Sequence, residues 1–415
     1  MDKLVLIKKT FVYFIILLLF YFIQNPVRFS FFSVTTFRLM SVIGVILLFV
    51  RFLMGYKNKL NIYLFSILIS SILIVVYFIS CFLNDFMIDF DWLNTNLVFI
   101  FSLFSFEIIF YIAKKNNIMI DIELITNLLA FSAFFRLLIG LVLFLQPSFY
   151  NLLSFVFAFS NSMVSHFDVR IVSLGFTFFG AGVFNSFVLV LLSYMIVNNR
   201  FKTIKLYVFL SLFILVIGML ESRTTIIGFI VGILYFFCKI SIKNIKRIIK
   251  ILKVLFRFFW ISSIVLYILF FNKNFANKVV KLANFGYEIF INYAISGEMT
   301  SASTNAMKNM YHFPTLGNYH TWLIGDGKFG NDLKGYYKHT DIGYCRIIYC
   351  NGIIGLLVFL FTQWLWLKNG IKEKELNYCL FLLLLILNLK GVTTFTLLVS
   401  PFYFIDKFSI GHSAK

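Results

Sequence analysis

The sequence predicts an all-α polytopic integral membrane protein. Of its 415 residues, 61% are hydrophobic and only 13% are charged, a balance far from that of soluble domains. Apolar runs long enough to cross a bilayer recur along the whole chain. Basic residues gather in alternate connections between these runs, as they do in proteins that cross a membrane many times.

Twelve apolar runs are candidate spans, and eleven is the alternative because the last two are short and closely spaced. The runs are 5–23, 32–53, 61–83, 93–113, 122–146, 172–197, 204–220, 224–240, 251–271, 342–367, 376–389 and 392–407. No small-residue cleavage site follows the first run, so we interpret it as a retained span. The predicted division is a membrane domain of spans 1–9 (1–271), a long connection (272–340) and a membrane domain of spans 10–12 (341–415).

The net charge of +20 would favour a nucleic-acid partner in a soluble protein, but here the basic residues mark connections between spans, and we expect no nucleic acid. The positive-inside rule places the basic connections and both termini in the cytoplasm. The 272–340 connection then lies on the outer side. A second outer connection contains Leu152–Phe159, which is apolar but too short to cross. We expect that segment to lie at the membrane interface.

Arginine is prominent among the basic residues of the outer side. The outer arginines are Arg28, Arg38, Arg136, Arg170, Arg223 and Arg346. A guanidinium matches phosphate oxygens in pairs, so arginines at outer helix ends suit a diphosphate ligand. The alternative is an ordinary interfacial arginine that reaches to lipid headgroups, which we favour for Arg28 and Arg38. For Arg170 and Arg223 both interpretations stay open.

Arg136 lies near the middle of a predicted span, where an ionisable group is costly and becomes a functional candidate. The nearest acid within a span, Glu107, lies at about 9 Å from the inner end, whereas Arg136 lies at about 22 Å. We therefore expect Arg136 to face a cavity that holds water or headgroups, with pairing to another residue as the alternative. Glu221 is a candidate substrate-binding residue or the ion-pair partner of Arg223, two residues away.

The end of the long connection concentrates polar functional groups. If it is helical, His339, Gly343 and Arg346 share one helix face. His339 or Asp341 could then take a proton from a hydroxyl group, and Arg346 could hold a phosphate. The alternative is that Asp341 only caps the next helix. His320, earlier in the connection, is a weaker substrate-binding candidate that we expect to be solvated.

The sequence predicts no metal and no other cofactor. The five cysteines show no ligand spacing. Asp89 and Asp91 form an Asp-x-Asp pattern that can hold a metal, but a solvated acidic loop is the favoured interpretation. Gly325–Gly330 is rich in glycine without the Lys-Ser/Thr of a phosphate loop, so it predicts a backbone turn.

Several of these segments together resemble the O-antigen and capsule polymerase family (Wzy-type), which is related to the O-antigen ligases. The matching segments are Leu323–Gly330, His339–Tyr344, Asn351–Gly355, Ser222–Thr225, and Arg170 ahead of Gly180–Gly182. The resemblance covers roughly residues 165–365. It depends on the order and the outer placement of short, individually weak motifs.

The resemblance implies a GT-C-like membrane glycosyltransferase of the bacterial inner membrane that uses no metal. It would transfer a growing glycan from undecaprenyl pyrophosphate to the non-reducing end of a lipid-linked repeat unit. Arg170 and Arg223 would neutralise the leaving group, Arg136 and Arg346 would assist, and His339 or Asp341 would act as base. Membrane lipid and a chain-length regulator are the other implied partners.

Two other functions are alternatives. An O-antigen ligase shares the layout, and the Asp341–Tyr344 run favours a polymerase over it. A flippase or transporter of lipid-linked oligosaccharide would account for the number of spans and for Arg136. It would not account for the long outer connection.

Overall fold

The structure is a computed structural model. It describes residues 2–54, 61–84, 88–159, 165–166, 169–176, 178–198, 203–239, 248–258, 260, 273–330 and 336–405. These residues are overwhelmingly helical, and the sheet among them has two short strands. Eight of the described helices are long and apolar enough to cross a membrane. The predicted all-α membrane protein is therefore confirmed at the level of class.

The chain forms two compact units that do not follow its order. Unit 1 comprises residues 1–19, 37–122 and 302–415, and unit 2 comprises residues 20–36 and 123–301. The predicted 272–340 connection is divided between them. Its described residues form α12 (Lys273–Gly286), α13 (Glu288–Ser296), α14 (Ala302–Lys308), α15 (Tyr319–Leu323) and the 3₁₀ turn η2 (Tyr337–His339).

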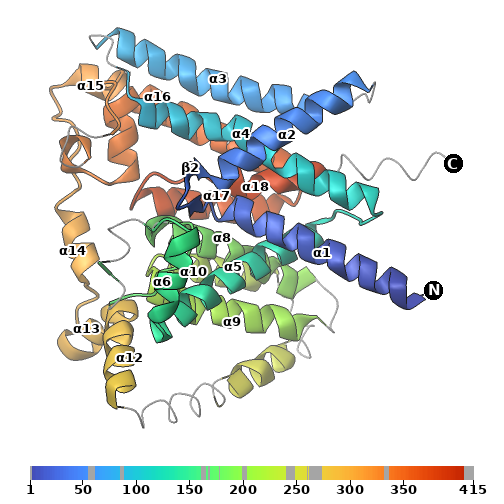
Figure 1. The fold of residues 1–415 in the computed structure, drawn as a ribbon. Coiled ribbons are helices and arrows are strands. Elements are labelled where there is room, and N and C mark those ends of the chain that lie inside the picture. Colours follow the sequence, from blue (N-terminus) through green and yellow to red (C-terminus); the bar gives the residue numbers. More distant parts are fainter. Residues whose placement is uncertain are drawn as a thin grey trace. The chain divides into compact units, whose positions relative to one another are not determined.

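Unit 1 is built around three long helices that pack side by side, α3, α4 and α16 (Figure 1). Aromatic side chains fill the space between them: Trp92, Phe99, Phe359 and Trp366 are all buried. The helices of this unit are α2 (Thr36–Leu53), α3 (Asn61–Phe82), α4 (Phe90–Lys115), α16 (Gly343–Gly370) and α17 (Lys374–Asn388), with most of α1 (Asp2–Gln24).

The glycine-rich segment before η2 is a backbone turn, as predicted. Gly325 and Gly327 have φ angles of +84° and +69°, which glycine adopts without strain. The residues just before this turn, at the end of α15, pack on α16 at Gly352, where φ is +66° and ψ is −171° inside the helix. A Cβ atom on Gly352 would overlap the backbone carbonyl of Leu323. The close approach thus fixes the turn against the helix.

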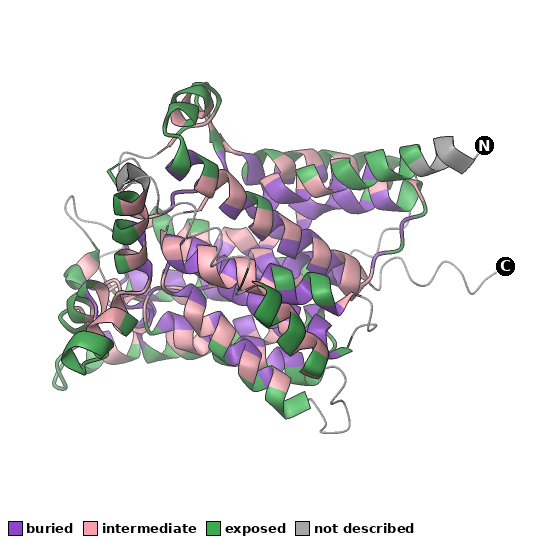
Figure 2. Ribbon diagram, turned by 90° about the horizontal axis from the view of Figure 1, so that it is seen from below, coloured by how far each residue is buried: buried purple, intermediate pink, exposed green. Residues whose placement is uncertain are grey.

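Unit 2 is organised around α8, whose residues are buried almost throughout and which packs on α9 and α10. Figure 2 shows buried and exposed residues alternating along the helices of the protein, as expected for helices that pack through one face. Small residues allow close packing: a Cβ atom on Gly228 of α10 would overlap the backbone of Ser186. The helices are α5 (Ile122–Leu145), α6 (Ser148–Val156), α8 (Phe178–Asn198), α9 (Ile204–Glu221) and α10 (Thr225–Lys239), with α12 and α13.

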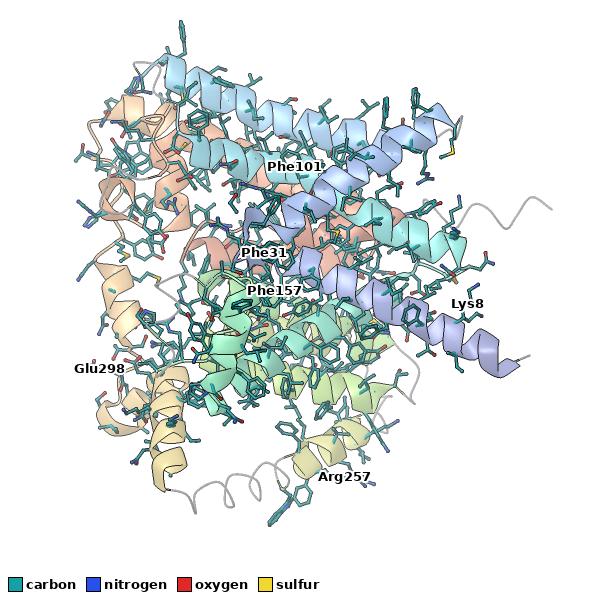
Figure 3. The ribbon with its side chains drawn as sticks, in the orientation of Figure 1. Lys8, Phe31, Phe101, Phe157, Arg257 and Glu298 are labelled. Atoms are coloured by element: carbon teal, nitrogen blue, oxygen red, sulfur yellow. The ribbon has the colours of Figure 1, made fainter. Side chains whose placement is uncertain are left out.

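The strands of unit 2 form a hairpin, β1 (Arg28–Phe29) and β2 (Phe32–Thr35), that is joined to α6. The Ser30 amide donates to the Val156 carbonyl at 2.9 Å. Phe29 stacks on both Phe31 and Phe157, two residues labelled in Figure 3. No residue of α6 is buried. The apolar segment expected at the interface is thus a short helix that does not cross.

Two predicted spans form helices that are short for a bilayer, and a third becomes helical later than predicted. Runs 224–240 and 376–389 form helices of 15 residues each, α10 and α17, shorter than the roughly 20 residues that a bilayer requires. Run 172–197 becomes helical only at Phe178, because residues 171–176 form no regular secondary structure. Run 251–271 lies mostly outside the described residues.

The last predicted span, 392–407, is wrong over the residues that the structure describes. Only α18 (Thr396–Val399) and the 3₁₀ helix η3 (Ser400–Phe404) form there. The Asn388 side chain accepts a hydrogen bond from the Thr393 amide at 3.0 Å, which holds the chain out of a helix. Because apolar character alone identified this run, the local capping that interrupts it was missed.

Candidate functional site

The centre of unit 2 holds a buried ion pair between Arg136 of α5 and Glu221 at the end of α9. Arg136 Nη2 lies 2.8 Å from Glu221 Oε2, and both side chains are almost fully enclosed, at 0% and 2% exposure. Two expectations are therefore wrong. Arg136 does not face a water-filled cavity, and Glu221 is the partner of Arg136 instead of Arg223. The negative charge of the Glu221 carboxylate compensates the positive charge of the Arg136 guanidinium. Charged groups buried in an apolar core need such a partner.

Two further polar side chains complete this network. Arg136 Nη2 donates to Asn185 Oδ1 at 2.8 Å, and Arg136 Nη1 donates to Ser173 Oγ at 3.1 Å. The Ser173 hydroxyl in turn donates to Glu221. Among the described atoms only Arg136 Nε lacks a hydrogen-bond partner on this guanidinium. The network joins α5, α8, α9 and the irregular segment before α8.

The buried network holds the two segments that carry Arg170 and Arg223. Ser173 lies three residues after Arg170, and Glu221 lies two residues before Arg223. The Ile171 amide also donates to the Leu220 carbonyl at 3.1 Å, which ties the two segments together directly. Both arginines thus extend from backbone that is anchored to the core.

The turn that carries Arg223 is tight, in line with the short gap between the apolar runs 204–220 and 224–240. The Ser222 amide donates to the Gly218 carbonyl at 2.8 Å, and α10 begins at Thr225. The Ser186 hydroxyl of α8 donates to the Thr224 carbonyl at 3.0 Å. A Cβ atom on Gly182 would lie 2.5 Å from Ser222 Oγ, so this glycine is needed for the close approach.

Arg170 and Arg223 form a pair around the ring of Phe285 in α12. The Cζ atom of each guanidinium lies 4.6 Å from the centre of that ring, and Arg170 Cζ also lies 3.9 Å from the centre of the Phe178 ring. Such contacts hold a guanidinium flat against an aromatic face. Burial, and then the nearby Arg223, lower the pKa of Arg170. Arginine still stays protonated, so two cations share this part of unit 2.

The two arginines differ in their carboxylate partners. Arg223 forms an ion pair with Glu288 of α13, whose side chain is 26% exposed. Among the described residues no carboxylate pairs with Arg170, and its Nε atom has no hydrogen-bond partner. The aromatic faces leave the edges of the guanidinium, which carry the N–H donors, to bind an anion. This part of unit 2 therefore combines excess positive charge with a rigid support.

His166 lies next to the arginine pair and was missed by sequence reasoning. Its ring meets the edge of the Phe178 ring at a centroid distance of 5.4 Å, on the same aromatic residue that supports Arg170. The amide of Arg170 donates to the carbonyl of His166 at 3.1 Å. Phe285 and Glu288 were missed as well, because nothing in the sequence indicates that α12 and α13 pack beside the Ser222–Thr224 turn.

Unit 1 contains a second arginine held between aromatic rings. Arg346 Cζ lies 4.0 Å from the ring centre of Phe329 and 4.3 Å from that of Tyr336. Its Nη2 atom donates to the Phe329 carbonyl at 3.2 Å, and its Nη1 atom lies 3.5 Å from Asp341 Oδ1. The Asp341 side chain is 40% exposed. Arg346 and Asp341 are thus brought together, as the sequence suggested.

The predicted helical register from His339 to Arg346 is wrong. Lys338 and His339 have φ angles of +54° and +53°, and α16 begins only at Gly343. The Thr340 hydroxyl donates to the Met310 carbonyl at 2.6 Å and fixes an extended residue before the helix. His339 is exposed, and no hydrogen bond, ion pair or ring contact joins it to Asp341 or Arg346 among the described residues.

The other candidates of unit 1 have structural roles or none. His320 is exposed, as expected. Asp89 caps α4 and accepts hydrogen bonds from the Phe329 and Gly330 amides, the first at 3.0 Å, so it is more than a solvated acid. Among the described residues no group of His, Cys, Asp or Glu is arranged to hold a metal ion.

The predicted site residues therefore form two groups. Arg136, Arg170, Arg223 and Glu221 belong to unit 2, whereas His320, His339, Asp341 and Arg346 belong to unit 1. Of the two groups, the one in unit 2 is the stronger candidate for an anion site, because the Arg136–Glu221 network anchors the backbone of both Arg170 and Arg223. Comparison of the chain with models of known protein families, with curated proteins and with solved structures found no match.

Proposed function

We propose that the protein is a polysaccharide repeat-unit polymerase, a membrane glycosyltransferase that uses a lipid-linked diphosphate donor. The donor is a growing O-antigen or capsule glycan on undecaprenyl pyrophosphate, and the acceptor is a repeat unit on the same carrier. The protein acts at the outer face of the bacterial cytoplasmic membrane, with both termini in the cytoplasm. A chain-length regulator is its expected protein partner.

The observation that carries this proposal is the Arg170–Arg223 pair around Phe285. A diphosphate bears several negative charges on oxygens that accept paired hydrogen bonds from guanidinium groups. Two arginines around one aromatic ring, with Glu288 as the one carboxylate paired to them among the described residues, match such a group. Eight helices of membrane-spanning character suit a substrate whose lipid tail stays in the bilayer.

The reaction needs the positive charge at the leaving group. The acceptor hydroxyl oxygen bonds to the anomeric carbon of the donor, and the bond from that carbon to the diphosphate oxygen breaks. The diphosphate leaves with the bonding electron pair, so negative charge grows on its oxygens. Arg170 and Arg223 stabilise that charge, and their anchored backbones keep the cost of reorganisation low.

The test is restoration of long glycans in bacterial cells that lack the gene. Arg170→Ala and Arg223→Ala should each reduce polymerisation about 10²- to 10³-fold, the usual effect of removing one donor to a developing anion. Arg170→Lys and Arg223→Lys should give intermediate chains, because lysine keeps the charge and loses the fork. Glycans are separated on a gel, and protein amount is measured by immunoblot.

Arg38→Ala is the matched control, because Arg38 is an exposed arginine outside both groups. It should leave chain length unchanged. Normal long chains in the Arg170→Ala and Arg223→Ala cells, at equal protein amount, would contradict the proposal. The lipid end of the product separates the alternatives: a polymerase product stays on undecaprenyl pyrophosphate, whereas a ligase product carries core lipid. Chain growth by the purified protein on lipid-linked repeat units would exclude transport as the main activity.

A further inference from the structure

One titratable side chain beside the arginine pair has no part in the function described so far. His166 is partly buried and contacts Phe178 at the start of α8, whose ring also lies under Arg170. The imidazole and the guanidinium therefore lie against one aromatic ring. Among the described residues, the contact shown for the His166 side chain is this ring contact with Phe178, and no hydrogen bond of its ring nitrogens is found.

We propose that His166 is the general base of the reaction, and this inference rests on the proposed function. An imidazole that shares the Phe178 ring with Arg170 lies near the place where the bond to the diphosphate would break. The candidate bases suggested by the sequence, His339 and Asp341, belong to unit 1, and His339 makes no contact with its expected neighbours. His166 supplies the missing acid–base group within unit 2 itself.

The proton balance of the step is simple. The unprotonated imidazole nitrogen of His166 takes the proton of the acceptor hydroxyl while that oxygen bonds to the anomeric carbon. The carbon–oxygen bond to the diphosphate breaks, and the electron pair leaves with the diphosphate. His166 then holds one proton, which it returns to water before the next cycle. No oxidant, metal or further reactant is needed.

The electrostatic surroundings favour the form of His166 that this role requires. Burial lowers the pKa of His166, and the positive charge of Arg170 lowers it further. Among the described residues, Arg223 in the α9–α10 turn and Glu288 of α13 also lie in this part of unit 2, and they pair with each other. A neutral imidazole at neutral pH can accept a proton, which a protonated one cannot.

The experiment measures binding and reaction separately with the full-length protein in lipid nanodiscs. Lipid-linked repeat unit extracted from cells that lack the gene is the substrate, and undecaprenyl pyrophosphate is the binding probe. His166→Gln and His166→Ala should lower the single-turnover rate constant about 10²- to 10⁴-fold, the range for loss of a general base. The dissociation constant of undecaprenyl pyrophosphate should stay within twofold of that of the unchanged protein.

The pH dependence gives a second readout that a structural role would not change. The rate of the unchanged protein should fall as the pH falls, with a midpoint below the ordinary histidine value of 6.5. The residual rate of His166→Gln should not fall in this way as the pH is lowered. His312→Ala is the control, since His312 is an exposed histidine outside both groups, and it should keep both rate and profile.

Each result bears on the inference. A normal rate in His166→Gln, or a loss that lies wholly in the dissociation constant, would overturn it. Arg170→Ala and Arg223→Ala serve as the reference for the proposed function. If those variants lose activity and His166→Gln does not, only the role of His166 fails. If the arginine variants stay fully active, the proposed function fails first.

Discussion

Arg136 and Glu221 lie 85 residues apart in the chain, yet Arg136 Nη2 and Glu221 Oε2 are 2.8 Å apart in the core of unit 2. Neither charge could be buried alone without a large desolvation cost. The pair also anchors the backbone on which Arg170 and Arg223 lie. Stability and the proposed anion site therefore depend on the same interaction.

Removing one member of the buried pair should destabilise the protein severely. Arg136→Met or Glu221→Gln should each cost about 3–5 kcal/mol, because a charge is left buried without its partner. The double variant Arg136→Met/Glu221→Leu should recover part of that loss. Thermal unfolding in detergent measures the effect, with Arg38→Met as the exposed control. Equal melting temperatures for the single variants and the unchanged protein would contradict the prediction.

Gly352→Ala should destabilise unit 1. The φ and ψ angles of +66° and −171° lie in a region that is essentially restricted to glycine, and the strain alone costs about 1–3 kcal/mol. The overlap of the new Cβ atom with the Leu323 carbonyl adds to that cost. Gly317→Ala is the matched control, since no atom lies within 4 Å of its added Cβ atom. A melting temperature equal to that of the control would show that the helix accommodates the methyl group.

Glu288→Gln should strengthen diphosphate binding. The substitution removes the only carboxylate that pairs with Arg223 among the described residues. Because this ion pair is partly exposed, the gain in affinity for undecaprenyl pyrophosphate should be modest, about two- to fivefold. Glu298→Gln is the control, an exposed glutamate shown in Figure 3 that forms no ion pair among the described residues. Unchanged or weaker binding in Glu288→Gln would mean that the carboxylate does not compete with the diphosphate.

The stability of unit 1 should depend on pH through Asp341. Burial raises the pKa of Asp341, although Arg346 and Lys390 oppose the shift. The folded protein therefore holds this proton more tightly than the unfolded chain. The resulting stabilisation is present below the ordinary value of 3.8 and is lost as the pH rises through the raised pKa. In Asp341→Asn this dependence should disappear. Melting temperatures of both proteins between pH 4 and pH 7 test it, and a constant difference between them would refute it.

The sequence predicted the membrane class and most long helices because hydrophobicity determines both. Apolar runs such as 61–83 and 122–146 correspond closely to α3 and α5. The run 392–407 did not, because its interruption depends on one asparagine side chain and not on hydropathy. The tight Ser222–Thr224 turn was predictable from the short gap between two apolar runs.

The candidate site was predicted only in part, because the residues that contact its arginines come from distant parts of the chain. Arg170 and Arg223 were identified from charge type and position, but their shared neighbour Phe285 looks like any apolar residue of the connection. Glu221 was assigned to the adjacent Arg223, whereas the fold pairs it with Arg136. His339 was assigned a helical register that two left-handed residues interrupt.

The buried charge pair also has a consequence for how the protein is made. Arg136 leaves the ribosome 85 residues before Glu221, so α5 first meets the insertion machinery with an uncompensated cation in its middle. Such a segment partitions poorly into hydrocarbon by itself. We expect α5 to be retained at the insertion site until α9 arrives, so that both helices move into the lipid together.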